Sequence, residues 1–386
     1  MGDSLGDLVE LRIDGLAAGG DGVGRTAEGR VVFVPFTAPG DVVRARIAEL
    51  HPRYARAELE EVTAASDARV APHCAVFGEC GGCGWQHVDY AAQCEAKGRI
   101  AEDALRRVGK LAPPGPIAMH PSPAPYAYRA RARVAVEDGR VGYRRRNSRA
   151  LCAVRRCPVL CAPAEAQLSA LADAPPARNG EWEIASGAGG ARAHEVGGAG
   201  PPIELAVGGD RLRVSAGVFF QANPALHAAL RDAVTRAAGG GVLALELHAG
   251  CGFFTLPLAR AFERVIAVEA DPAAAEDLRH NLARAGLANV EVATERVERA
   301  LDGRLGAFRP DAVVLDPPRT GLPRGAAARL CALEPARIAY LSCDPATLAR
   351  DLAALAGGGY ALEAVEAFDL FPHTPHVEVL ASLRRT

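Results

Sequence analysis

Two reactive side chains lie near the carboxyl end of the chain. Cys343 stands in the sequence Ser-Cys-Asp-Pro, and Glu378 follows 35 residues later at the end of Phe-Pro-His-Thr-Pro-His-Val-Glu. A cysteine thiolate adds reversibly to electron-poor carbon atoms. A carboxylate with a suitable pKa can then remove a proton from the adduct. The pair therefore indicates covalent catalysis, with Cys343 as the nucleophile and Glu378 as the general base.

A second group of reactive side chains is a set of cysteines in the amino-terminal half. Cys74, Cys80 and Cys83 are spaced as Cys-x5-Cys-x2-Cys, and the two glycines before the last cysteine let the backbone turn both thiols toward one centre. A closed site needs a fourth thiolate. The candidates are Cys152, Cys157 and Cys161. Proline after a ligand cysteine recurs in iron–sulfur sites, which favours Cys157. The spacing predicts a metal site and leaves zinc and a [4Fe–4S] cluster both open.

The residues around Cys343 belong to a segment in which strands alternate with helices. Strands are predicted at residues 242–247, 265–268, 290–292, 312–315 and 338–341, and helices at 254–261 and 272–285. This alternation predicts a parallel, doubly wound α/β sheet over residues 214–386. Functional residues of such sheets collect at the carboxyl ends of the strands. Gly250, Glu269, Asp316 and Cys343 all fall at those ends.

A glycine turn and an acidic residue predict a nucleoside site in this sheet. Gly250 and Gly252 follow the first strand, and Glu269 ends the second strand, where a carboxylate can accept both ribose hydroxyls. A nicotinamide-binding domain would look similar. Phe254, however, replaces the third glycine that makes room for pyrophosphate. A strand-terminal Asp-Pro-Pro beginning at Asp316 is also typical of methyltransferases acting on planar nitrogen heterocycles. Both features favour S-adenosylmethionine (AdoMet).

Two regions precede the sheet. In residues 5–64, short alternating apolar runs separated by Gly and Asp turns predict a five-stranded β-barrel, either an RNA-binding barrel or a generic β module. Residues 65–213 form a predicted α+β region with the cysteines, a helix at 90–108 and a Gly- and Ala-rich loop at 186–202. The segment from residue 129 to residue 149 contains eight arginines and only two acidic residues, and such a local excess of positive charge favours phosphate contacts.

The length and composition limit the classes of protein to which this chain can belong. A length of 386 residues, with 49% hydrophobic and 23% charged residues, is that of a globular protein of two or three domains. Residues 1–24 contain no uninterrupted apolar run, so we expect neither a signal peptide nor a membrane span, and the cytoplasm is the expected location. The net charge of −2 argues against a protein that coats nucleic acid through bulk charge. We expect a monomer.

The motifs resemble those of the AdoMet-dependent RNA (uracil-5-)-methyltransferases, whose catalytic domain has the class I, Rossmann-like fold. The matching stretches are residues 220–224, 250–259, 316–321, 342–351 and 371–378. The amino-terminal region looks like a TRAM domain, and Gln86-His87 after the third cysteine also fits the family pattern. The resemblance covers nearly the whole chain, and the chain resembles in particular the iron–sulfur 23S rRNA enzymes of the RlmD type.

The resemblance implies methyl transfer from AdoMet to C5 of a uridine in structured RNA, and 23S rRNA is the RNA that we expect. The Cys343 thiolate would add to C6 of the base, and Glu378 would remove the C5 proton after methylation. Gln221 and Asp316 would place cofactor and uracil, and Glu269 would hold the AdoMet ribose. The resemblance also implies that a [4Fe–4S] cluster is held by four cysteines: Cys74, Cys80, Cys83 and Cys157.

The sequence departs from the family pattern at several positions. His248 and Phe253 stand where the family usually has an aromatic residue and an asparagine, Arg296 stands where a polar residue often contacts adenine, and Asp344 replaces the commoner asparagine. The cofactor-binding residues that we assign are Gln221, His248, Gly250, Gly252, Phe253, Glu269 and Asp316. Two alternative functions stay open. The first is the same reaction on the T-loop of tRNA, and the second is a non-catalytic RNA-binding or assembly factor.

Overall fold

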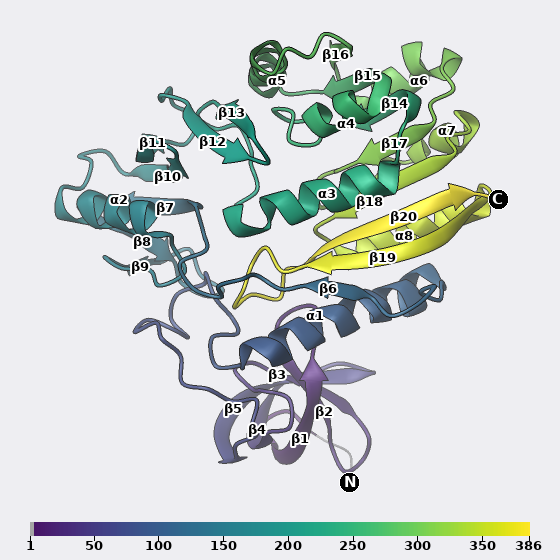
Figure 1. Ribbon diagram of the computed structural model, residues 1–386. Coiled ribbons are helices and arrows are strands. Elements are labelled where there is room, and N and C mark those ends of the chain that lie inside the picture. Colours follow the sequence, from purple (N-terminus) through teal and green to yellow (C-terminus); the bar gives the residue numbers. More distant parts are fainter. Residues whose placement is uncertain (1–3) are drawn as a thin grey trace.

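The computed structural model describes residues 4–386, and its amino-terminal part is a small closed β-barrel (Figure 1). The strands are β1 (Leu8–Leu16), β2 (Gly22–Arg25), β3 (Val31–Val34), β4 (Val42–Leu50) and β5 (Tyr54–Ala64), joined in the order β1-β2-β3-β5-β4. Alternate side chains such as Leu11 and Ile13 point into its core, as the period of a strand requires. The predicted five-stranded barrel is confirmed.

A second, antiparallel sheet follows the barrel. Its strands are β7 (Arg131–Glu137), β8 (Arg140–Arg144), β9 (Leu151–Ala153), β10 (Gly180–Gly187) and β11 (Gly190–Glu195), in the order β11-β10-β7-β8-β9. Helix α2 (Ala162–Asp173) packs on it, and the hairpin of β12 (Ile203–Val207) and β13 (Asp210–Val214) follows. The prediction of a loop over 186–202 was wrong for residues 186–195, where β10 and β11 form a hairpin, whereas residues 196–202 lie outside the strands. Small side chains do not prevent a ladder that pairs Ile184 with Ala193.

The carboxyl-terminal sheet has eight strands in the order β16-β15-β14-β17-β18-β20-β19-β6. They are β6 (Ala118–His120), β14 (Gly241–Leu247), β15 (Phe262–Glu269), β16 (Val290–Thr294), β17 (Ala312–Leu315), β18 (Arg337–Ser342), β19 (Tyr360–Phe368) and β20 (Glu378–Arg385). Strands β14 to β18 are parallel as predicted, whereas β20 is antiparallel to both of its neighbours. Strand β6 comes from the middle of the chain and pairs with β19.

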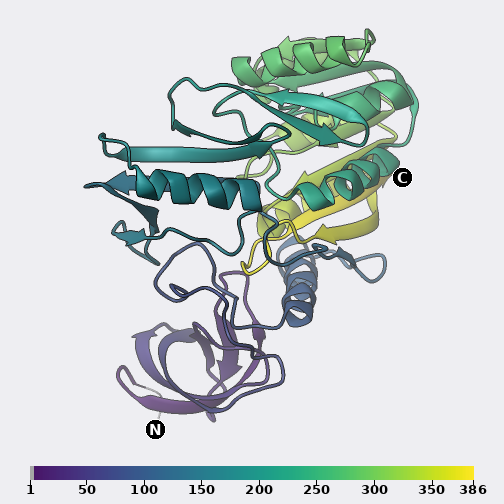
Figure 2. The same cartoon turned by 60° about the vertical axis from the view of Figure 1, so that its left-hand side comes forward.

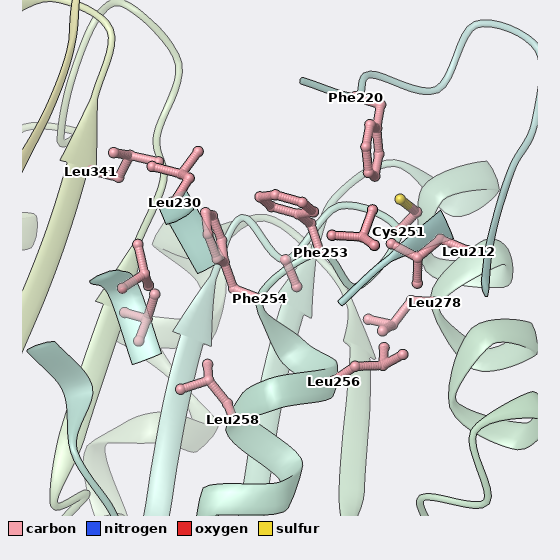
Figure 3. Close-up of a cluster of buried hydrophobic side chains, with 14 of the residues drawn as sticks. Leu212, Phe220, Leu230, Cys251, Phe253, Phe254, Leu256, Leu258, Leu278 and Leu341 are labelled. Atoms are coloured by element: carbon pink, nitrogen blue, oxygen red, sulfur yellow. The ribbon is translucent and has the colours of Figure 1, made fainter. Parts of the chain in front are cut away.

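Helices cover both faces of this sheet. One face carries α3 (His227–Ala238), α4 (Thr255–Ala261) and α5 (Pro272–Arg284), and the other carries α1 (Tyr90–Ala104), α6 (Val297–Asp302), α7 (Ala326–Ala332) and α8 (Pro345–Gly357). Short turns η2 (Pro224–Leu226) and η3 (Arg304–Ala307) flank α3 and α6. Phe253 and Phe254 lie in the apolar core of the first face (Figure 3). The predicted doubly wound fold is confirmed.

Helix α1 lies between the barrel and the eight-stranded sheet (Figures 1 and 2). It begins after Asp89, whose carboxylate accepts a hydrogen bond from the Ala91 amide at 2.9 Å. Its last turn widens into the π-helical turn η1 (Leu105–Gly109), against α8. A Cβ on Gly109 would lie 2.8 Å from the carbonyl oxygen of Ala349, so this approach needs glycine. No helix within residues 4–386 is long and apolar enough to cross a membrane.

The arginine-rich segment is largely engaged in ion pairs. Its pairs are Arg131–Glu183, Arg133–Glu181, Arg144–Glu137, Arg145–Glu79 and Arg146–Asp21. Arg146 also lies 4.4 Å over the ring of Phe36 in the barrel. The local excess of positive charge seen in the sequence is therefore partly neutralised by carboxylates from other elements. Arg146 serves to tie the central sheet to the barrel.

Candidate active site

A cavity of about 440 Å³ opens at the carboxyl ends of the parallel strands. Its walls come from the turns after β14, β15, β17 and β18, from the first residue of β20, and from residues 218–221. The sequence-predicted catalytic and cofactor residues that line it are Gln221, His248, Gly250, Phe253, Glu269, Asp316, Cys343 and Glu378. Gly252 is the one member of the predicted set that does not. Residues from six separate segments therefore line one space.

Cys343 and Glu378 are brought together by one antiparallel strand pair. Strand β18 ends at Ser342, which pairs with Val379 of β20. Cys343 therefore leaves its strand beside the point at which Glu378 begins its own. Residues 344–377, which lie between them, include α8, β19 and the loop 369–377, and this loop returns the chain to the same edge of the sheet.

The environment of the pair holds protons on both groups. Glu378 is buried, and burial followed by the Asp316 carboxylate raises its pKa to about 8. Burial and the Glu378 carboxylate raise the pKa of the half-buried Cys343 thiol to about 11. Burial likewise raises the pKa of Asp316 to about 7, although the residue as a whole is only partly buried. The thiolate thus requires a positive partner.

Arg319 is the side chain that supplies positive charge at this point. Its guanidinium lowers the pKa of both Cys343 and Glu378 against the effect of burial. It lies in the Asp-Pro-Pro-Arg motif, three residues after Asp316, and lines the cavity. We predicted no role for this arginine from the sequence. Its spacing from a strand-terminal aspartate was the available signal.

Helix α8 also favours the thiolate, because Cys343 lies directly before its first turn. The Asp344 side chain caps the helix by accepting hydrogen bonds from the amides of Ala346 and Thr347, at 3.0 and 2.8 Å. Aspartate and asparagine cap equally well, which explains why Asp344 can replace the commoner asparagine. The positive end of the helix dipole stabilises a nearby thiolate.

The glycine turn and Glu269 form the other end of the cavity. The two carboxylate oxygens of Glu269 accept hydrogen bonds from the amides of Gly250 and Asp271, both at 2.7 Å. Each oxygen has a further lone pair that can accept a hydroxyl. Gly252 has φ of +100°, and a Cβ there would lie 2.7 Å from Leu278 Cδ1 of α5. The second glycine therefore shapes the turn against α5.

Two buried polar atoms on this cavity have no partner among the described residues. They are Oε1 of Gln221 and Nε2 of His248. His248 also has a left-handed backbone, with φ of +63°, and burial lowers its pKa so that the ring is neutral. Unpaired buried polar groups cost free energy, and strained residues cluster at ligand sites. Both atoms fit a cavity built to hold a polar ligand such as AdoMet.

The floor of the cavity is aromatic. Phe253 packs edge to face against Phe220 and Phe254, with ring centroids 5.2 and 4.7 Å apart (Figure 3). Phe253 thus offers an apolar surface where the family usually has an asparagine. Arg296, by contrast, is exposed and does not line the cavity. Sequence reasoning missed Phe219, which is 72% exposed at the rim, and its place beside Phe220 and Gln221 was the only signal.

A second cavity, of about 820 Å³, meets the first at Cys343 and Arg319. It runs between the barrel, which contributes Arg25 and Phe33, and helix α1, which contributes Arg99. The nucleophile therefore faces a cofactor-sized cavity on one side and a larger groove on the other. Nothing in the sequence spacing indicated this groove, because three distant segments form it.

The four predicted cluster ligands lie in loops that meet beside the central sheet. Cys74 and the Cys80–Cys83 turn follow β5, and Cys157 lies between β9 and α2. Burial, together with neighbouring thiols, raises the pKa of Cys80 to about 12 and that of Cys83 to about 11. Charge on Cys157 or Cys74 raises the pKa of Cys83, and charge on Cys74 raises the pKa of Cys157. The thiols therefore lie within electrostatic range of one another, and Cys152 also acts on Cys80.

This set differs from a site for a single ion. Within residues 4–386, no three His, Cys, Asp or Glu side chains converge in a way that would hold a metal ion. A cluster occupies the volume between its ligands, so its thiols need not meet at one point. Of the other candidate ligands, Cys152 is buried in the core on β9, and the Cys161 thiol lies 3.5 Å from the Ser186 hydroxyl. The donor chemistry fits an iron–sulfur cluster held by the four thiols.

Comparison with known proteins links these features to named families. The family model described as tRNA (Uracil-5-)-methyltransferase matches residues 204–386, and the TRAM domain model matches residues 4–59. An uncharacterized RNA methyltransferase of Thermosynechococcus vestitus is 34% identical, over 98% of each chain. The 23S rRNA (uracil(1939)-C(5))-methyltransferase RlmD of Alkalilimnicola ehrlichii is 33% identical, over 97% of this chain and 96% of that protein.

Among solved structures, the tRNA (uracil-54, C5)-methyltransferase of Pyrococcus abyssi, in complex with S-adenosyl-L-homocysteine, has the same fold. Its TM-score is 0.73 at 23% identity, and the match covers 96% of this chain and 99% of that chain. The match therefore includes the barrel and the central sheet as well as the eight-stranded sheet.

Proposed function

The chain belongs to the AdoMet-dependent RNA (uracil-5-)-methyltransferases, and from that premise we propose that it methylates C5 of a uridine in 23S rRNA through a covalent bond between Cys343 and C6. The observation that carries the proposal is the meeting of Cys343 and Glu378 on one cavity with the glycine turn and Glu269. A non-catalytic RNA-binding factor has no need to keep nucleophile and base on adjacent strand ends.

The residues divide the chemistry between them. The Cys343 sulfur forms a bond to C6, and the C5–C6 π electrons move toward the C4 carbonyl oxygen, which makes C5 nucleophilic. AdoMet, when bound, supplies the methyl group that C5 takes. Glu378 then removes the C5 proton, the C5–C6 double bond re-forms, and the sulfur leaves as a thiolate. The base must be out of any helical stack to reach Cys343.

The charges of the pair suit this order of steps. A protonated Glu378 does not repel the Cys343 thiolate, so its raised pKa favours the first addition. Once the sulfur is bonded to C6 it carries no charge, and ionisation of Glu378 is then opposed by burial and Asp316 alone. Elimination restores the thiolate after the proton has moved. The two groups thus avoid being ionised together.

The cofactor is assigned to the first cavity and the RNA to the groove. Glu269 would accept the ribose hydroxyls, and the unpaired atoms of Gln221 and His248 would bind polar groups of AdoMet or the uracil. Phe253 and Asp316 complete the same wall, with Gly250 and Gly252 shaping the turn. RNA flanking the target uridine would lie between the barrel and α1.

We also propose that Cys74, Cys80, Cys83 and Cys157 hold a [4Fe–4S] cluster. Thiols whose ionisation is opposed by burial and by one another need a positive centre, which a cluster supplies. Nothing in the uracil reaction transfers electrons, so the cluster has a structural or RNA-contacting role.

The proposed domains are residues 5–64 and 65–213 for RNA, the latter with the cluster, and 214–386 for methyl transfer. A cytoplasmic monomer is the form that suits an enzyme acting on large RNA.

The choice of 23S rRNA over tRNA rests on sequence similarity. The relative named for 23S rRNA is 33% identical, whereas the one named for tRNA is 23% identical. The test is to map 5-methyluridine in rRNA and tRNA from a strain lacking the gene, with the gene and its C343A variant restored as controls. Loss of one 23S rRNA site, recovered only with the active gene, is expected. Loss of the T-loop modification would assign tRNA instead, and an unchanged pattern would contradict the proposal.

A further inference from the structure

The loop that delivers Glu378 to the active site is held from outside the catalytic sheet. It spans residues 369–377, between Phe368 at the end of β19 and Glu378 at the start of β20, and these two residues pair across the strands. Figure 1 shows the loop extending beyond the sheet toward the segments that enter from the barrel and the central region. The loop also carries His376, which lines the groove beside Cys343.

The first anchor is a fully buried ion pair between α1 and the start of the loop. The Lys97 ammonium donates to Asp369 Oδ1 at 2.5 Å and to the carbonyl oxygen of Phe371 at 2.9 Å, and both charged side chains have no exposed area. Lys97 and the exposed Lys110 are the two lysines of a chain with 44 basic residues. A compact ammonium with three donors fits this enclosed point, which a planar guanidinium would not.

The second anchor is Gln93, one helical turn before Lys97. Its amide oxygen accepts a hydrogen bond from the His373 backbone amide at 2.7 Å, and its Nε2 lies 3.1 Å from His373 Nδ1. The same Nε2 donates to the carbonyl oxygens of Trp85 and Val88, at 3.1 and 2.8 Å. Gln93 is fully buried, so these bonds form without competition from water.

Further anchors come from the loop after Cys83 and from the central region. The backbone amides of Gly84 and Trp85 both donate to the carbonyl oxygen of His373 at 2.9 Å, and the Tyr128 hydroxyl donates to that of Pro372 at 3.1 Å. His373 has φ of +64°, a left-handed conformation that a non-glycine residue keeps only when its surroundings impose it. Residues 369, 371, 372 and 373 are therefore all fixed by groups from the amino-terminal half.

We propose that Lys97 and Gln93 are positioning residues for the general base. They act by clamping the 369–373 segment so that β20 begins with Glu378 beside Cys343. The inference rests on the proposed function, because it assigns these residues to the step that Glu378 performs. It separates two roles for α1. The helix packs on the sheet through Ala101, which Leu105 of η1 extends, and it holds the catalytic loop through Lys97 and Gln93, one and two turns before Ala101.

The clamp predicts a specific kinetic defect. Glu378 acts after methylation, so a displaced base should slow release of the methylated RNA from Cys343 while formation of the adduct continues. Misplacement by about 1 Å can lower a rate about 100-fold. Simple loss of stability would instead lower formation and release together.

The experiment follows the denaturation-resistant adduct between the anaerobically prepared full-length protein and a 23S rRNA fragment, with methyl-labelled AdoMet, in a single turnover. The variants are Lys97→Met, Gln93→Leu and Tyr128→Phe. Tyr128→Phe removes one hydroxyl and preserves packing. Lys110→Met, at the exposed second lysine, is the matched control for Lys97→Met. We expect release to slow by about tenfold or more in the first two, less in the third, with formation within about threefold of the unchanged protein and of the control.

Equal slowing of formation and release, or unchanged release, in Gln93→Leu and Tyr128→Phe would overturn the clamp. The Glu378→Gln variant, measured in the same assay, distinguishes a failure of the positioning role from a failure of the proposed catalytic role of Glu378. If Glu378→Gln accumulates the adduct and the α1 variants do not, the positioning role alone is wrong. If Glu378→Gln accumulates no methylated adduct, the role of Glu378 is wrong.

Discussion

The pKa of Glu378 leads to a quantitative prediction for the release step. With a pKa of about 8, roughly one tenth of Glu378 is ionised at pH 7 and roughly nine tenths at pH 9. Proton removal from C5 needs the carboxylate, so release of methylated RNA should become about tenfold faster between these pH values and then level off. Formation of the adduct depends on the Cys343 thiolate and should still rise above pH 9, because that pKa is about 11.

Two substitutions should move this profile in opposite directions. Asp316→Asn removes a negative charge that raises the pKa of Glu378, so the midpoint should fall. Arg319→Gln removes the positive charge that lowers it, so the midpoint should rise. The assay is rapid quenching of a preformed adduct at each pH, followed by a denaturing gel. A release rate that is flat from pH 6 to 9, or a midpoint near the ordinary value of a glutamate, would refute the reasoning.

Three other outcomes follow from single residues. Glu246 is buried on β14, and burial raises its pKa to about 8, so the natural protein should lose stability as the pH rises toward 8. The free energy of unfolding of Glu246→Gln, measured in urea, should therefore rise by about 2 kcal/mol relative to that of the natural protein between pH 6 and pH 8.5. Gly252→Ala should cost about 2 kcal/mol and weaken AdoMet binding in calorimetry, because the added Cβ meets Leu278. Cys157→Ser should lose iron and visible absorption in anaerobic preparations, whereas Cys161→Ser should keep about four irons.

The parts that the sequence predicted well are those governed by local patterns. Alternation of apolar residues defined the barrel, and the alternation of strands and helices defined the parallel sheet. The carboxyl-end rule then placed Gly250, Glu269, Asp316 and Cys343 at one edge, and all four line the cavity. These relations need no knowledge of how distant segments pair.

The parts that were not predicted depend on pairing between distant segments. The antiparallel entry of β20 beside β18 sets Glu378 against Cys343, and no local pattern reports that register. The same holds for β6, which joins the catalytic sheet from the middle of the chain. Residues 186–195 were predicted as part of a loop because Gly and Ala carry little strand signal, yet cross-strand partners place them in a hairpin. The anchors of Lys97 to a loop 272 residues later are equally invisible in sequence.

The most direct test of the account is the bond between Cys343 and the base. The protein is incubated with AdoMet and RNA containing 5-fluorouridine, whose C5 fluorine cannot be removed as a proton, and the product is digested and analysed by mass spectrometry. We predict a denaturation-resistant adduct that carries one methyl group, maps to Cys343, and is absent from Cys343→Ala. An adduct that survives in Cys343→Ala, or no adduct with the natural protein while uridine RNA is methylated, would contradict the central claim.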